Sequence, residues 1–275
     1  MTPLPFALGA AAALLFLLPC WAPWRPGKDD GLELRPLGTL GNALAWATAV
    51  VAVYYATKDR LPVWPPTEAE HYWAFGAVAC LVPALLEGRT WAGATLLGSA
   101  LWGAFAWFST APLREHFWEG RDAWLQPAAA IGAGVLLFLL RPVPRAGDGT
   151  GGAREPRAGW ADGPSYPGAL ALATAAGAGV LGQSYGGAAH WAGGLAFVPA
   201  ALALLAMHRP AVRYWPGLAS TWSFGLPGLL FAGMWFAETP WSSALLVAFA
   251  PQVCRIPLGA RRAPRLAAVG HGVLV

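Results

Sequence analysis

The amino-acid sequence predicts an all-α protein, a polytopic transmembrane helical bundle. Of its 275 residues only 12% are charged and 56% are hydrophobic, and the mean hydropathy of +0.47 lies outside the range of a soluble domain. The charges cluster in short segments between apolar runs long enough to cross roughly 30 Å of hydrocarbon. These runs are continuous and rich in Leu and Ala, whereas a membrane β-barrel needs alternating segments of about ten residues. We therefore reject a barrel.

Nine apolar runs are predicted to span the membrane. The first has no basic segment before it, no A-x-A cleavage site and only a poor lipobox at "LLPC", so we expect it to be retained as a span. The last is the weakest, because Pro251, Gln252 and Arg255 shorten its apolar part. The predicted spans are 4–24, 38–57, 70–88, 91–109, 124–140, 167–185, 189–207, 215–237 and 241–257.

The basic residues predict how these spans are oriented. Fourteen of the eighteen Lys and Arg residues fall in the segments after spans 1, 3, 5 and 7, at Arg255 near the end of span 9, and in the C-terminal tail. Since basic residues near spans stay in the cytoplasm, the N-terminus is predicted outside and the C-terminus inside. Sixteen of the eighteen are Arg, and Ala, Gly and Pro are abundant, which points to a GC-rich bacterial genome. We therefore expect the chain in a bacterial inner membrane.

A Pro/Gly/Arg-rich segment, 141–165, divides the bundle into two membrane halves. It has neither a helical nor a strand period, which is typical of a linker. Gly147, Gly149 and Gly152 match G-x-G-x-x-G, but no strand precedes them and no apolar helix of a βαβ unit follows, so we favour a linker over a nucleotide loop. The predicted parts are an N-terminal half 1–140, a cytoplasmic linker 141–165, a C-terminal half 166–257 and a basic cytoplasmic tail 258–275.

The two halves share an ordered set of landmarks, which predicts a parallel internal repeat of spans 2–5 and 6–9. His71 and His190, each followed by an aromatic residue, open spans 3 and 7. The landmarks that follow are Val82-Pro83 with Val198-Pro199, Trp107-Phe108 with Trp235-Phe236, and Trp124 with Trp241. Because the offset is an even number of spans, both copies face the same way. Tryptophans also mark membrane interfaces in any helical protein, which is the alternative explanation of the likeness.

The stretch "VWPPTEAEHYW" holds a dense group of polar side chains directly before the third span. Thr67 and Glu70 have the spacing of an S/T-x-x-E capping box, and the two prolines stop any helix before them. Acidic residues early in a helix also favour the positive end of its dipole. A helix entrance therefore accounts for every residue of the stretch except His71.

A site on the outer face is the alternative interpretation. Imidazole and carboxylate side chains suit Zn or Fe and general acid/base work, but no H-E-x-x-H, H-x-x-x-H or G-x-S-x-G spacing occurs, so we favour solvated loops and expect no cofactor. The three cysteines form no CxxC pair, which argues against a disulfide framework or a zinc knuckle. The candidate catalytic residues are His71, His116, His190, Glu70, Glu119 and Glu238, and the candidate metal ligands are Glu68, His71, His116 and His190.

The interior of the predicted spans is almost free of ionisable residues. No Asp, Glu, Lys, Arg or His is expected deep within a span, which argues against a proton pump. The hydroxyl residues of "STWS", from Ser220 to Ser223, are expected to bond within or between helices rather than to line a pocket. Small residues recur at four-residue spacing and allow close helix approach, and sixteen tryptophans exceed what two interfacial belts need.

These observations favour a non-catalytic accessory or structural subunit, whose Trp and small-residue faces bind partner helices or lipid. Its expected partners are the bilayer and other membrane subunits, with no nucleic acid and no nucleotide, and no enzymatic activity is expected. Two alternatives stay open. One is a transporter or flippase-like carrier of a neutral or amphiphilic small molecule, indicated by the repeat and the mid-span prolines. The other is an outer-face membrane enzyme that uses the His and carboxylate candidates.

Overall fold

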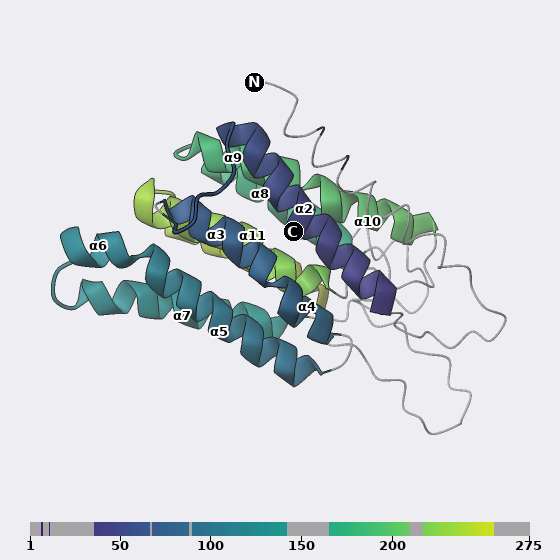
Figure 1. The fold of residues 1–275 in the computed structure, drawn as a ribbon, viewed down its shortest axis with the longest axis horizontal. Helices are drawn as coiled ribbons and strands as arrows, with labels where there is room; N and C mark the ends of the chain where they lie inside the picture. Colours follow the sequence, from purple (N-terminus) through teal and green to yellow (C-terminus); the bar gives the residue numbers. More distant parts are fainter. Residues whose placement is uncertain are drawn as a thin grey trace.

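The chain folds into a bundle of helices (Figure 1). A computed structural model describes residues 7, 11, 36–66, 68–87, 90–141, 165–208 and 217–255. Every regular element within these ranges is helical, which confirms the all-α prediction for this part of the chain. The elements are α2 (Pro36–Lys58), α3 (Ala69–Ala79), α4 (Leu81–Glu87), α5 (Trp91–Ser109), α6 (Ala111–His116), α7 (Asp122–Leu140), α8 (Ser165–Leu181), α9 (Gly186–Leu195), α10 (Phe197–His208), α11 (Leu218–Phe236), α12 (Trp241–Phe249) and the 3-10 helix η2 (Ala250–Arg255).

The helices lie where the apolar runs are. The bounds of α5 are those predicted for the fourth span, and α7, α8 and α11 begin within about three residues of predicted spans. Three helical segments are long and apolar enough to cross a membrane, namely Ala69–Glu87, Asp122–Leu140 and Gly186–Leu204. The count of nine spans stays a prediction. Most of the first predicted span, nearly all of the linker and the basic tail lie outside the described residues.

Two of these three segments are interrupted at a single residue. α3 passes into α4 at Cys80, three residues before Pro83, and α9 passes into α10 at Ala196, three residues before Pro199. Proline has no N–H to donate and its ring clashes with the carbonyl four residues earlier, so a helix tends to bend there. The third and seventh predicted spans therefore carry the same kind of interruption at the same point.

Helix α11 lies at the centre of the described bundle. Every residue from Leu218 to Met234 is buried. The helix contacts α2, α3, α4, α5, α7, α8, α9 and α12, which come from both halves of the chain. A helix that is apolar on every side is stable only when neighbours surround it, and this one is surrounded.

Tryptophan rings packed onto glycines fill the space around α11. A Cβ atom at Gly225 would lie 2.8 Å from the ring of Trp46, and one at Gly228 would lie 2.4 Å from the ring of Trp73. Only a residue without a side chain lets the rings approach so closely. The fully buried tryptophans are Trp46, Trp73, Trp102 and Trp222. These four tryptophans are core residues, so any tryptophan that serves a partner or lipid has to be one of the others.

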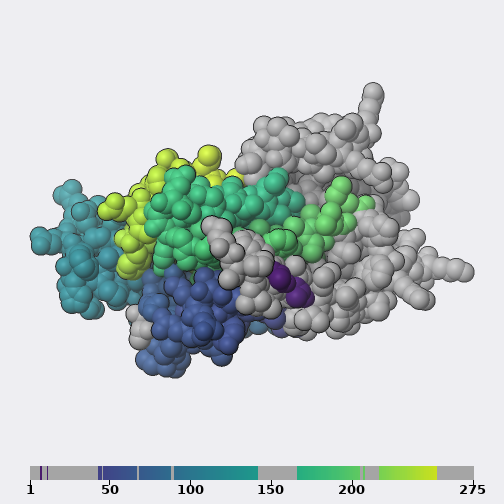
Figure 2. Space-filling view, turned by 90° about the horizontal axis from the view of Figure 1, so that it is seen from above, coloured from purple at the N-terminus to yellow at the C-terminus, as the bar shows by residue number. Residues whose placement is uncertain are grey.

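The two halves of the chain pack directly on each other. α2 contacts α9, and α3 contacts α11. In the view of Figure 2, the blue surface of the N-terminal half lies against the green surface of the C-terminal half. α5 and α7 pack on each other as a hairpin. The surface of this hairpin that points away from the bundle is apolar and exposed. Its exposed large side chains include Leu96, Phe108, Trp124, Leu125 and Leu136.

Candidate functional site

A buried group of polar residues joins three helix ends at the predicted cytoplasmic side. Glu87 is the last residue of α4, Arg141 directly follows α7, and Ser220 lies in the first turn of α11. Trp91 and Thr95 from the start of α5, together with the backbone of Gly217, complete the group. We call these six residues the Glu87–Arg141 cluster.

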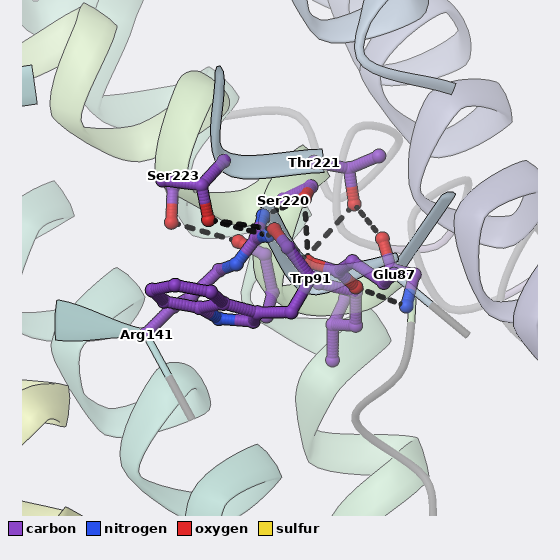
Figure 3. Close-up of polar contacts among 10 residues, drawn as sticks. Glu87, Trp91, Arg141, Ser220, Thr221 and Ser223 are labelled. Atoms are coloured by element: carbon purple, nitrogen blue, oxygen red, sulfur yellow. Dashed lines mark hydrogen bonds and ion pairs between the residues drawn. The ribbon is translucent and has the colours of Figure 1, made fainter. Parts of the chain in front are cut away.

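The carboxylate and the guanidinium are paired directly and through a hydroxyl (Figure 3). Arg141 Nη1 lies 3.1 Å from Glu87 Oε1 and donates to Ser220 Oγ at 2.6 Å. That hydroxyl donates to Glu87 Oε1 at 2.5 Å. The other carboxylate oxygen, Oε2, accepts from the amide of Gly217 at 2.5 Å. Each carboxylate oxygen of Glu87 therefore accepts a hydrogen bond from the start of α11, and Oε1 also pairs with Arg141.

The second guanidinium nitrogen reaches α5. Arg141 Nη2 donates to the carbonyl of Trp91 and to Thr95 Oγ1, both at 3.1 Å. The side chains of Arg141 and Glu87 are 0% and 1% exposed. Removing two charges from water costs several kcal/mol per ion, and only close pairing with further hydrogen bonds offsets this cost. The cluster has both features.

The cluster links the two halves of the chain. Glu87 belongs to the N-terminal half and Arg141 directly follows its last helix, whereas Ser220 and Gly217 belong to the C-terminal half. Separating the halves at this end would expose or orphan a buried charge. Leaving one member of a buried pair without its partner costs about 3–5 kcal/mol.

A second charged group lies at the predicted outer side, where α2 ends and α3 begins. Lys58 Nζ lies 2.5 Å from Glu70 Oε2, and Arg60 pairs with Glu68. The imidazole of His71 is fully buried, and its Nε2 lies 3.9 Å from a carboxylate oxygen of Glu68. We call these five residues the Lys58–Glu70 cluster.

Helix α9 of the C-terminal half packs against the Lys58–Glu70 cluster. A Cβ atom at Gly187 would lie 3.7 Å from Lys58 Nζ and 4.0 Å from Glu70 Oε1. The ring of Tyr54 lies edge-on to Trp191, with centroids 5.1 Å apart, and 6.0 Å from the ring of His71. The outer cluster thus also lies between the two halves.

The predicted site residues are only partly brought together. Glu68, Glu70 and His71 lie in one group, and His190 is half-buried on α9 beside Trp191. The remaining three candidates are exposed, with His116 at the end of α6, Glu119 in the turn after it, and Glu238 after α11 at a φ of 55°. No three His, Cys, Asp or Glu side chains in the described ranges form a group that could hold a metal ion. The catalytic and metal roles stay predictions.

The helix entrance has a different geometry from the predicted capping box. α3 begins at Ala69, and its N-cap is Glu68, which makes no side-chain capping hydrogen bond. Glu70 is buried, and its carboxylate lies against Lys58. Thr67, the other half of the predicted box, lies outside the described residues. An ion pair between α2 and α3 is therefore the contact that the structure gives to Glu70.

Sequence reasoning missed the Glu87–Arg141 cluster. The prediction concerned ionisable residues deep within spans, and Glu70, His71, Glu87 and Arg141 lie at or beside the ends of predicted spans, yet all four are buried. The sequence does show that Glu87 and Arg141 carry opposite charges at span ends on the same predicted side. Nothing in the sequence shows that two residues so far apart are paired. Within "STWS", Thr221 and Ser223 bond back to the preceding turn as expected, whereas the hydroxyl of the first serine joins the cluster.

The chain matches no protein-family model, no curated protein and no solved structure, so its function has to be argued from these two clusters and the helices that carry them.

Proposed function

We propose that the chain is a multi-pass inner-membrane protein with nine spans, its N-terminus outside and its C-terminus in the cytoplasm. The helices found at the predicted positions from the second span onward support this count. We also propose that spans 2–5 and 6–9 are parallel repeats. The matching interruptions at Cys80 and Ala196, each three residues before a proline, support the repeat beyond its tryptophan landmarks.

Within this topology we propose a carrier of a neutral or amphiphilic small molecule. One observation carries the proposal: a single kinked segment, Ala69–Glu87, has an ion pair at each end. Glu70 in its first turn pairs with Lys58 on the outer side, and Glu87 at its last residue pairs with Arg141 on the cytoplasmic side. A carrier needs separate closures at the two faces of the membrane, and a helix interrupted between them lets the two ends move independently.

Aromatic rings from α3, α5 and α11 pack on one another in the core of the bundle. Trp73 packs on Trp102 and Phe224 with ring centroids 5.0 and 5.4 Å apart, and Trp102 packs on Phe231 at 5.6 Å. An interior of this kind interacts with the apolar body of a molecule through its ring faces. It therefore favours a cargo with a large apolar part, such as a lipid-like amphiphile, over a small ion.

Lipid movement in reconstituted vesicles tests the proposal. The purified protein is placed in liposomes that contain a fluorescent phospholipid, and a membrane-impermeant reductant is added outside. We expect the fluorescence of the inner leaflet to be lost as well, because the carrier brings those lipids to the outer face. A heat-denatured sample and an entrapped soluble dye control for leakage. Bleaching limited to the outer leaflet, as in protein-free liposomes, would contradict the proposal.

A non-catalytic accessory subunit is the second candidate. The surface of α7 that points away from the bundle favours it. Ala128 and Gly132 are exposed one helical turn apart, and a Cβ at Gly132 would meet nothing within 4 Å. Leu125 and Leu136 flank them and are also exposed. A small-residue face between leucines is a surface on which another membrane helix packs closely. The other arguments for this candidate have weakened, because charges are buried and four tryptophans belong to the core.

The mass of the protein purified in mild detergent tests this second candidate. A stable complex with another membrane protein, lost when Ala128 and Gly132 are both replaced by leucine, is the result expected for a subunit. The carrier proposal expects the chain without such a partner.

An outer-face enzyme with Zn or Fe at Glu68 and His71 stays a third proposal. Metal analysis of the same sample tests it.

A further inference from the structure

We infer that the Glu87–Arg141 cluster is a movable closure, which seals the predicted cytoplasmic end when the ion pair forms and opens that end when the pair separates. The inference rests on the proposed carrier function. It adds to that function the residues that open and close one face, and the direction in which the chain moves.

The helix that bears the carboxylate is short and separately hinged. α4 has seven residues, and the interruption at Cys80 separates it from α3. α3 is fixed to the centre by its own contacts, since Trp73 packs on Gly228 and Phe224 packs on Gly76. α4 in turn contacts α2, α5 and α11. In this inference its last turn moves away from α11 while α3 stays in place.

The contacts of Glu87 lie on the boundary that such a shift would open. Its partners are Arg141 after α7 and the amide and hydroxyl at the start of α11. Moving the end of α4 away from α11 breaks all of these contacts together, because they converge on one carboxylate. The structure has this carboxylate paired, and the inference adds a second arrangement in which it is separated from these donors.

The composition of the cluster favours a moving part over a static one. Apolar side chains of similar volume often stabilise a buried boundary as well as an ion pair does, so a buried pair is weak evidence for a purely structural role. Ionisable residues within membrane helices are expensive and usually functional. Among the described atoms, Arg141 Nε is buried without a hydrogen-bond partner. The closed arrangement therefore leaves one donor of the guanidinium unsatisfied.

Cys80 provides a built-in reporter of opening. Its thiol is fully buried at the interruption between α3 and α4. It lies about two helical turns before Glu87 in the same span. We expect a shift of α4 away from α11 to make this thiol accessible from the predicted cytoplasmic side.

Thiol labelling of a single-cysteine protein tests the inference. Cys20 and Cys254 are replaced by serine, and membrane vesicles of both orientations are treated with an impermeant maleimide. We expect E87Q to label at Cys80 on the order of tenfold faster than its parent when the cytoplasmic face is outward, because the neutral amide no longer pairs with Arg141. We expect no increase when the outer face is outward.

A matched control comes from the ion pair at the other end of the Ala69–Glu87 segment, which joins Glu70 to Lys58 of α2. K58Q removes the outer ion pair and leaves the cytoplasmic cluster intact, so it should not raise labelling of Cys80 from the cytoplasmic side. S220A removes one bridging hydroxyl without changing a charge, and we expect an intermediate increase. E87Q labelling no faster than the parent would overturn the closure. So would equal labelling from both faces, which would indicate a loosened fold instead of a directed opening.

Labelling and lipid movement separate the two proposals. If E87Q exposes Cys80 from one face but the wild-type protein moves no lipid, the closure stands and the lipid-carrier function falls. If the wild-type protein moves lipid but E87Q leaves Cys80 protected, the carrier stands and this closure falls.

Discussion

The two ends of the Ala69–Glu87 segment hold ion pairs that differ in burial. At the predicted cytoplasmic end, Arg141 and Glu87 are both almost fully buried, and a hydroxyl and a backbone amide complete their hydrogen bonds. At the outer end, Glu70 is buried, but its partner Lys58 is 26% exposed, and the Arg60–Glu68 pair beside it is about half exposed. The same chemistry is therefore dry at one end and partly solvated at the other, and the free energy of each contact should follow that difference.

Removing the guanidinium at the dry end should have the largest effect. We expect R141L to lower the free energy of unfolding by about 3–5 kcal/mol, because Glu87 is left buried without its charge partner. Thermal and denaturant unfolding in detergent, followed by circular dichroism, measures the change. The double variant E87L/R141L should lose clearly less, since no charge is then orphaned. A double variant as unstable as R141L alone would contradict this account.

Removing the cation of the Lys58–Glu70 pair should lower the free energy of unfolding by less. K58M leaves the carboxylate of Glu70 without its ion pair, and we expect a loss of about 1–3 kcal/mol, as for a buried acceptor that loses its donor. Water already reaches the partly exposed lysine, so it is able to solvate part of the remaining charge. The same unfolding measurement compares K58M with R141L. A loss as large as that of R141L would mean that the two ends are equally dry.

Removing the bridging hydroxyl tests how much of the dry end depends on hydrogen bonding alone. S220A keeps both charges and removes the donor to Glu87 Oε1 and the acceptor for Arg141 Nη1. We expect a loss of about 1 kcal/mol, since the direct ion pair and the Gly217 amide remain. S223A is the matched control, because that hydroxyl only bonds back to the carbonyl of Ala219. Equal losses in both variants would show that the bridge adds nothing.

Local pattern was enough to predict where the helices lie. The bounds of α5 follow from an apolar run between charged segments, which is information contained in neighbouring residues. Proline positions alone do not show where a span is interrupted, because two helical segments are interrupted three residues before Pro83 and Pro199, whereas Pro127 and Pro227 lie inside α7 and α11.

The sequence did not reveal which residues meet across the bundle. Glu87 and Arg141 lie at the ends of different helices, and their pairing depends on how α4, α7 and α11 pack. The same holds for Trp73, whose ring packs on Gly228 of a helix far along the chain. An indole looks the same in a sequence whether it lies at a membrane interface or in a core, so burial had to come from tertiary structure.

The exposed pair at the outer end should have the smallest effect and the clearest dependence on salt. Arg60 and Glu68 are 51% and 42% exposed, and exposed ion pairs contribute about 1 kcal/mol or less. R60A should therefore lower the free energy of unfolding by no more than this amount. Because salt screens exposed charges more than buried ones, the difference between R60A and wild type should shrink when the ionic strength is raised, whereas the effect of R141L should not. If the difference in free energy of unfolding between R60A and wild type persists at high salt, this pair is shielded from water. The two ends would then differ in their hydrogen-bond partners and not in their solvation.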